Sequence, residues 1–152
     1  MVKFRGQFDL RVDDKCRLSV PAGYRQALEL HGDQRLVLVK STAGPCLQGF
    51  TVQDWEEQED RIMALPKSDP VVLKLLRFQV ASAQMVEPDG HGRFVLPPSL
   101  RPYAGIAPSS EVALVGQIRR FEIWARERWQ TESEQCAESL PEWSAELARL
   151  GL

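Results

Sequence analysis

Two pairs of oppositely charged residues stand at the same spacing in two parts of the chain. Asp13 and Arg17 are four residues apart, and Asp89 and Arg93 repeat the pair 76 positions later. An arginine guanidinium can bind a phosphate group, or read the edge of a guanine through two parallel hydrogen bonds. An aspartate in a turn accepts hydrogen bonds from nearby backbone N–H groups. The sequence therefore offers two copies of one small polar tip.

Further polar residues lie within each tip. Lys15 and His91 stand between the paired residues, and Gly92 directly precedes the second arginine. At hairpin tips, Lys15, Arg17, His91 and Arg93 would suit contact with a phosphate or a guanine, whereas Asp13, Asp89 and Gly92 would organise the turns. The alternative is a purely structural role, because an exposed Asp–Arg pair that only braces a turn contributes about 0–1 kcal/mol.

Enzyme chemistry is a poorer interpretation of the duplicated aspartates. Aspartic proteases also draw one aspartate from each of two halves, and the two carboxylates share a proton. Those sites need a small hydroxyl residue and a glycine after each aspartate, whereas this chain has DDK and DGH. The two histidines and three cysteines show no metal-ligand spacing, and no P-loop or G-x-S-x-G motif is present. We predict no catalytic residues, metal, cofactor or small-molecule substrate.

The repetition extends beyond the tips. The full pattern D-x-x-x-R-x-x-x-P-x-x-x-R occurs twice, and the apolar run 36–39 returns as 112–115. Phe50 and Trp55 match Trp124 and Trp129 at a shift of 74. Internal repetition of this kind indicates two similar units fused in one chain. A fused pair can form a pseudo-two-fold body that presents both tips on one surface.

The hydrophobic pattern predicts which elements carry the tips. Apolar residues alternate over 8–12 and 18–20, which favours a hairpin of two half-buried strands around the first tip. A short helix follows from Pro21 to Gly32, with Tyr24 and Leu28 on one face. Two buried strands, 35–40 and 46–50, then precede a helix over 51–65, in which Trp55, Ile62 and Met63 are expected to face inward.

The second unit repeats this order after a connecting helix. Asp69 and Pro70 are typical of a helix start. The expected divisions are a first unit (1–66), a linker helix (67–78), a second unit (79–139) and a C-terminal helix (140–152). In that last helix, Trp143, Leu147 and Leu150 form an apolar stripe that we expect to pack on its own domain.

Composition indicates an ordinary globular protein of 152 residues, 43% hydrophobic and 26% charged. No apolar run is long enough to span a membrane, and the first residues show no signal-peptide pattern. Three widely spaced cysteines do not suggest a disulfide framework, so we expect a cytoplasmic location. Residues 1–40 carry eight basic and five acidic residues, whereas 121–152 carry three basic and seven acidic residues. Charge is therefore polarised along a chain whose net charge is −2.

Together, four segments resemble the MraZ family. They are KFRGQFDLRVDDKCRLSVPAGYR, the CLxxF-x4-W segment, LRFQVASAQMVEPDGHGRFVLPPSLRPYAG and VALVGQIRRFEIWARERW. The resemblance covers residues 3–130 in order, and it includes both D-x-x-x-R motifs. It implies an α+β fold of two tandem AbrB-like swapped-hairpin units, of the double-split β-barrel kind, in one pseudo-two-fold body.

The resemblance also implies a function. It points to a bacterial transcription regulator, here a repressor, that forms closed homo-oligomeric rings and associates with the nucleoid. Such a protein binds direct repeats upstream of the cell-division and cell-wall gene cluster through its D-x-x-x-R motifs, which correspond here to Asp13, Arg17, Asp89 and Arg93. With this resemblance we predict that Lys15, Arg17, His91 and Arg93 contact DNA. Double-stranded DNA and other copies of the chain are then the expected partners. The alternative hypothesis is a ring-forming assembly or adaptor protein without a primary role on DNA.

One position departs from the family pattern. The family has glycine before the arginine of the first motif, as Gly92 stands in the second, but this chain has Cys16. A left-handed backbone costs a residue with a Cβ atom about 1–2 kcal/mol. Because an isolated tip has few contacts to enforce such strain, we predict that the first turn relaxes to another geometry and shifts Arg17.

Overall fold

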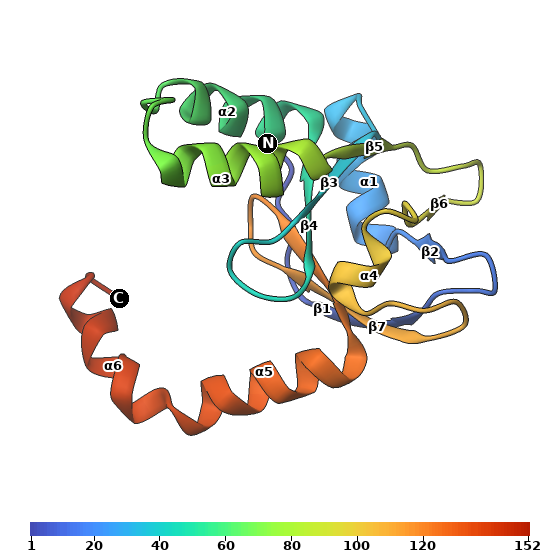
Figure 1. Ribbon diagram of the computed structural model, residues 1–152. Helices are drawn as coiled ribbons and strands as arrows, with labels where there is room; N and C mark the ends of the chain where they lie inside the picture. The colour runs from blue at the N-terminus through green and yellow to red at the C-terminus, as the bar shows by residue number, and fades with distance from the viewer.

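The computed structural model describes residues 1–152 as an α+β fold (Figure 1). The first half contains β1 (Gln7–Arg11), β2 (Arg17–Ser19), α1 (Ala22–His31), β3 (Leu36–Lys40), β4 (Leu47–Thr51), α2 (Val52–Met63) and α3 (Pro70–Phe78). After a 3-10 turn, η1 (Val80–Ser82), the second half contains β5 (Gln84–Val86), β6 (Arg93–Val95), α4 (Arg101–Ala104), β7 (Glu111–Gly116), β8 (Phe121–Ala125), α5 (Arg126–Glu138) and α6 (Leu140–Arg149).

Strand order shows the repeat directly. The large antiparallel sheet runs β1-β7-β8-β4-β3-β5, and a two-stranded ribbon pairs β2 with β6. The repeat makes β1, β2, β3 and β4 the counterparts of β5, β6, β7 and β8. When each strand is exchanged for its counterpart, the order of the large sheet is simply reversed, and the ribbon still pairs β2 with β6. The two repeats predicted from the sequence therefore build one interleaved body.

The simple hairpin expected over residues 8–20 is wrong. Only its tip closes, through a hydrogen bond from the backbone N–H of Asp13 to the carbonyl oxygen of Arg17 at 3.2 Å. Beyond the tip, β1 pairs with β7 and β2 pairs with β6, so both arms find partners in the other half. Periodicity identified the strands correctly, but it carries no information on which strand each one pairs with.

The core lies between the large sheet and the elements that wrap around it. It is a cluster of 20 buried residues drawn from both halves, including Phe4, Leu18, Phe94 and Phe121. The run from Leu36 to Val39 is buried on both faces of the sheet, since its alternate residues join two different clusters. A continuous apolar run is the pattern expected of such a doubly covered strand.

Local capping chemistry sets the helix ends. Thr51 accepts a hydrogen bond from the backbone N–H of Asp54 at 3.0 Å, and Asp69 accepts one from Val71 at 2.9 Å. Gly32 ends α1 with a left-handed φ of 87°. In α2, Trp55 and Ile62 are buried as predicted, but Met63 is exposed because it is the last residue of the helix, close to the turn that leads to α3.

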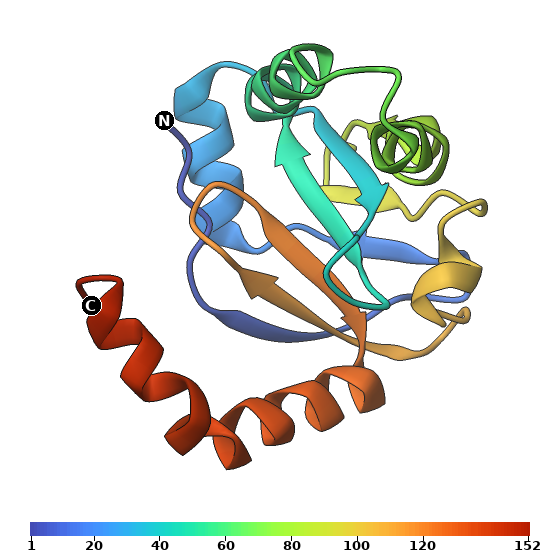
Figure 2. The same cartoon turned by 60° about the vertical axis from the view of Figure 1, so that its left-hand side comes forward.

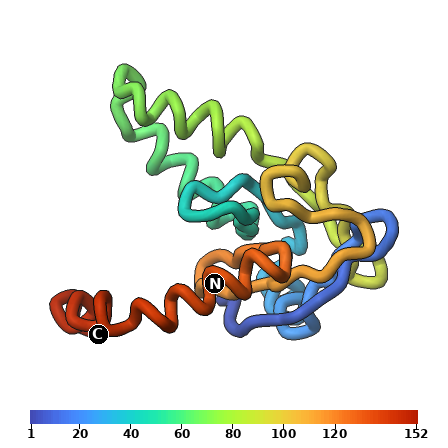
Figure 3. The backbone as a smooth tube through the Cα atoms, turned by 60° about the horizontal axis from the view of Figure 1, so that its bottom comes forward, coloured from blue at the N-terminus to red at the C-terminus, as the bar shows by residue number.

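The C-terminal helices project from the body. Figures 1, 2 and 3 show α5 leaving the sheet and α6 lying apart from all other elements except α5. No side chain of α6 is buried. The expectation that its apolar stripe packs on its own domain is therefore wrong. None of the helices is long and apolar enough to cross a membrane.

Candidate nucleic-acid interface

The β2–β6 ribbon brings the two arginines together. In its antiparallel register Arg17 faces Val95 and Ser19 faces Arg93. Directly paired residues share a face, and so do residues two apart on one strand. Arg17 and Arg93 therefore lie on one face as diagonal neighbours, whose Cα atoms are roughly 7–8 Å apart in ordinary sheet geometry. The opposite face carries Leu18 and Phe94, which are buried in the core.

The first tip is closed by the carboxylate of Asp13. Its Oδ1 accepts hydrogen bonds from the backbone N–H groups of Lys15, at 2.9 Å, and of Arg17, at 2.8 Å. Its Oδ2 accepts from Nε of Arg17 at 2.6 Å. The ion pair uses Nε alone, so both terminal nitrogens of the guanidinium stay without a hydrogen bond in the chain. Asp13 thus orients Arg17 and leaves both terminal nitrogens of the guanidinium able to form paired hydrogen bonds with another group.

The second tip repeats this arrangement with a looser arginine. Oδ1 of Asp89 accepts from the backbone N–H groups of His91, at 2.8 Å, and of Arg93, at 3.0 Å. Nη2 of Arg93 lies 3.5 Å from Oδ2 of Asp89, and its Nε is buried without a partner. The guanidinium of Arg93 is therefore held less tightly by the aspartate of its own turn than that of Arg17.

Electrostatics keep both aspartates ionised. The backbone N–H of Arg17 is the main cause that holds the pKa of Asp13 below its usual value. The backbone N–H of Arg93 has the same effect on the pKa of Asp89. Each carboxylate is therefore an acceptor at neutral pH, which suits it to arrange a turn and not to donate a proton.

The prediction that the first turn relaxes is wrong. Cys16 has a left-handed φ of 56°, close to the 73° of Gly92. In both tips the residue before the arginine donates its N–H to the aspartate carbonyl, at 3.0 and 2.9 Å.

The tip is not isolated, which is why the strain is maintained. The Cys16 carbonyl accepts a hydrogen bond from Leu96 at 2.9 Å, and its side chain is buried in the core. These contacts over-determine the backbone, so the geometry persists despite the Cβ atom. Arg17 consequently keeps the position that corresponds to Arg93.

A further arginine supports the second tip. Arg25, on α1, crosses to the other half, and its Nη1 lies 3.5 Å from the His91 carbonyl oxygen. It fills the space beside Gly92, where a Cβ atom would lie 2.6 Å from Nη1 of Arg25. Its repeat counterpart, Arg101, instead donates to the carbonyl of Leu96 at 2.8 Å. Both arginines end the repeated sequence pattern, so the signal was present, but the pattern alone gave them no role.

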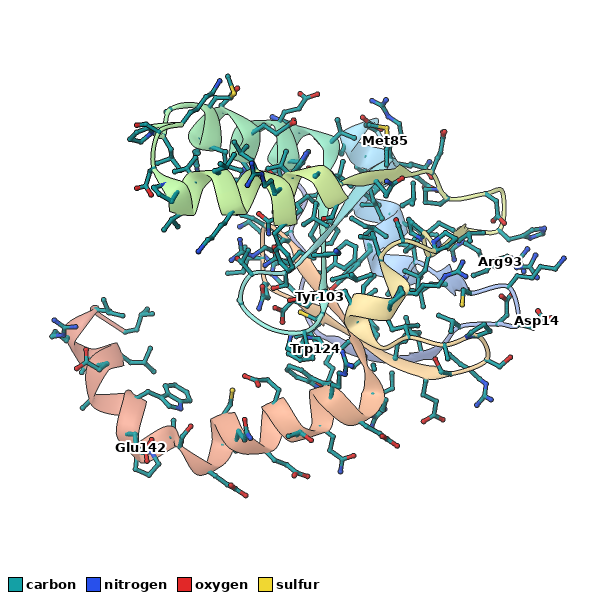
Figure 4. All side chains as sticks on the ribbon, in the orientation of Figure 1. Asp14, Met85, Arg93, Tyr103, Trp124 and Glu142 are labelled. Atoms are coloured by element: carbon teal, nitrogen blue, oxygen red, sulfur yellow. The ribbon has the colours of Figure 1, made fainter.

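All four predicted contact residues come from these two tips. The tips lie at one end of the molecule, as the labels Asp14 and Arg93 show in Figure 4, and Glu142 on α6 lies far from them. Lys15 and His91 are exposed, and Arg17 and Arg93 are half-buried.

Comparison with known proteins agrees with the repeated architecture. The family model of the MraZ protein matches residues 3–78 and 80–149, one match for each half. "Transcriptional regulator MraZ" of Coxiella burnetii (strain RSA 493 / Nine Mile phase I) is 40% identical over 139 residues, which cover 91% of this chain and 90% of that protein. The protein of the same name from Shewanella oneidensis is 34% identical over 137 residues, covering 90% and 89%. This chain belongs to the MraZ family.

Proposed function

We propose that this chain is a sequence-specific DNA-binding transcription regulator that uses the β2–β6 ribbon and its two tips as the reading surface. The observation that carries the proposal is the shared outward face of Arg17 and Arg93. The major groove of B-DNA admits a two-stranded ribbon, and arginine reads guanine there through two hydrogen bonds. The names of the two relatives support a role in transcription.

The roles of the tip residues follow from their geometry. Arg17 and Arg93 supply contacts to phosphate or guanine, and Lys15 and His91 add exposed donors beside them. Asp13 and Asp89 fix the turns and stay off the DNA, since their ionised oxygens would repel phosphate. Arg25 acts as a positioning residue, because it contacts the backbone of the second tip.

The chain's fold and assembly belong to the same proposal. We regard residues 1–66 and 79–139 as two AbrB-like swapped-hairpin units, which the pairing of β1 with β7 and of β2 with β6 supports. Homo-oligomeric rings would place several ribbons on one duplex, so that weak single contacts gain from effective concentration. The expected targets are direct repeats upstream of the chain's own operon in the cell-division and cell-wall cluster, where the bound ring represses transcription in the cytoplasm.

Binding to that upstream DNA tests the proposal. Arg17→Ala combined with Arg93→Ala should abolish specific binding in fluorescence anisotropy. Each lost phosphate contact should also reduce the steepness of the plot of log binding constant against log salt concentration by about 0.9. Arg61→Ala is the matched control, because this exposed arginine lies on α2, away from the tips. Unchanged affinity for DNA in the folded double variant would refute the assigned surface. Repression is tested with a reporter gene placed behind the upstream DNA: if its expression stays low in cells that lack the protein, the protein is not a repressor.

A further inference from the structure

Two apolar surfaces are left uncovered in the single chain. One is the groove beside α3, a hollow of about 360 Å³. Its lining combines apolar residues with one threonine and one lysine: Thr42, Leu65, Val71, Val72, Lys74, Leu75 and Phe78. Val71 is 69% exposed and Leu65 is 43% exposed. Such residues normally mark a contact surface when they gather in one hollow.

The second uncovered surface is the stripe on α6. Leu140, Trp143, Leu147 and Leu150 follow one another at three- and four-residue intervals, which places them on one face of the helix. Leu150 is 71% exposed and Trp143 is 40% exposed. Nε1 of Trp143 donates to the Cys136 carbonyl at 3.1 Å. This bond satisfies the polar atom of the indole and ties α6 to the end of α5.

The base of α5 holds the stripe away from the chain's own groove. Trp129 packs against Trp124 with ring centroids 5.8 Å apart, and Nη1 of Arg128 donates to the Tyr103 carbonyl at 2.9 Å. α5 then runs outward without a buried side chain. Figures 1 and 3 both show α6 well separated from α3, so the two surfaces do not meet within one copy.

Charge favours contact between the two surfaces. The segment 67–78, which contains α3, carries three basic residues, Lys67, Lys74 and Arg77, and one acidic residue, Asp69, for a net charge of +2. The segment 138–152, which contains α6, carries three glutamates and one arginine, for a net charge of −2. Complementary charges around an apolar centre steer two surfaces together and fix their register.

We propose that α6 of one copy docks in the α3 groove of a neighbouring copy. An amphipathic helix in an apolar groove is a recurring recognition mode. The groove and the helix are different surfaces, so each copy offers one of each and the contact runs head to tail. The inference rests on the homo-oligomer of the proposed function and names the contact that builds it.

Oligomer mass tests the contact. Leu147→Asp, or Val71→Asp in the groove, should weaken self-association at least about tenfold, since a charge replaces an apolar side chain that the proposed contact would bury. Light scattering should then show smaller species at micromolar concentration. Ala145→Asp is the control, because it adds the same charge on the opposite side of α6 and should leave the mass unchanged. A full-sized oligomer in both groove and stripe variants, with unchanged dissociation on dilution, would overturn the proposal.

Cross-linking shows which copy supplies the helix. In a Cys136→Ser background, one tagged chain carries Leu147→Cys and a differently tagged chain carries Val71→Cys. Mild oxidation of the mixture should produce a disulfide that joins the two tags. If a chain carrying both cysteines instead closes only on itself, α6 folds onto its own groove and the proposal is wrong.

DNA binding separates this inference from the proposed function. Leu147→Asp leaves both tips intact, so a single ribbon should still bind DNA weakly, whereas binding that depends on several ribbons should fall. An oligomer that survives Leu147→Asp while Arg17→Ala and Arg93→Ala abolish DNA binding would refute the docking contact alone. Loss of the oligomer with no DNA binding in any form would refute the proposed function alone.

Discussion

Replacing Gly92 with alanine should destabilise the protein through two separate effects. The φ of 73° is left-handed, which costs a residue with a Cβ atom about 1–2 kcal/mol. The added Cβ would also lie 2.6 Å from Nη1 of Arg25 and 3.0 Å from its Cζ, so the guanidinium must move. Because about 1 kcal/mol shifts the Tm of a chain this size by 2–4 °C, the backbone effect alone predicts a fall of roughly 2–8 °C.

Calorimetry at fixed protein concentration measures this change. Gly90→Ala is the matched control, since it lies in the same turn, its φ is not positive and a Cβ there meets nothing within 4 Å. Adding Arg25→Ala to Gly92→Ala should recover the steric part but not the backbone part, giving a coupling of about 0.5–3 kcal/mol. Gly92→Ala with the Tm of the wild-type protein would show that the second tip relaxes freely, and the account of both tips would fail.

Three further results are expected. Cys136 is exposed, whereas Cys16 and Cys46 are buried, and burial raises the pKa of Cys46 to about 12. A thiol reagent should therefore modify Cys136 quickly and the other two cysteines only when the protein unfolds. Fast modification of all three would contradict the burial of Cys16 and Cys46 in the core. Cys16→Ser should lower the free energy of unfolding by about 1–3 kcal/mol in urea, because a hydroxyl replaces a buried apolar group. The pKa values of Asp13 and Asp89 are lowered in the folded state, so their contribution to stability is present above about pH 4 and is lost as the pH falls through the folded pKa values. The pH dependence of Tm between about pH 5 and 2 should be shallower in the Asp13→Asn, Asp89→Asn variant, and an identical slope would refute this role.

Local signals in the sequence predicted local structure well. Asp69 caps the helix whose start it marks, and Gly32 ends α1 as expected. These features depend on a few neighbouring backbone groups, so a short stretch of sequence contains all the information.

Features that depend on distant parts of the chain were not predicted. Strand alternation cannot choose between a neighbouring strand and one in the other repeat, so the pairing of β1 with β7 was missed. The contact between Leu96 and Cys16 is likewise long-range, and it is what holds the strained first tip. The stripe on α6 was recognised as apolar, but amphipathicity does not say what covers a helix.

The interleaved sheet has a consequence for how the chain folds during synthesis. β1 has no strand to pair with until Glu111–Gly116 has been made, and β2 must wait for Arg93–Val95. The first half therefore leaves the ribosome as an unfinished structure with open strand edges, and closing long loops slows the final step. A stop codon between the repeats would not release a stable half-protein. It would release an edge-exposed fragment that either pairs with a second fragment or aggregates.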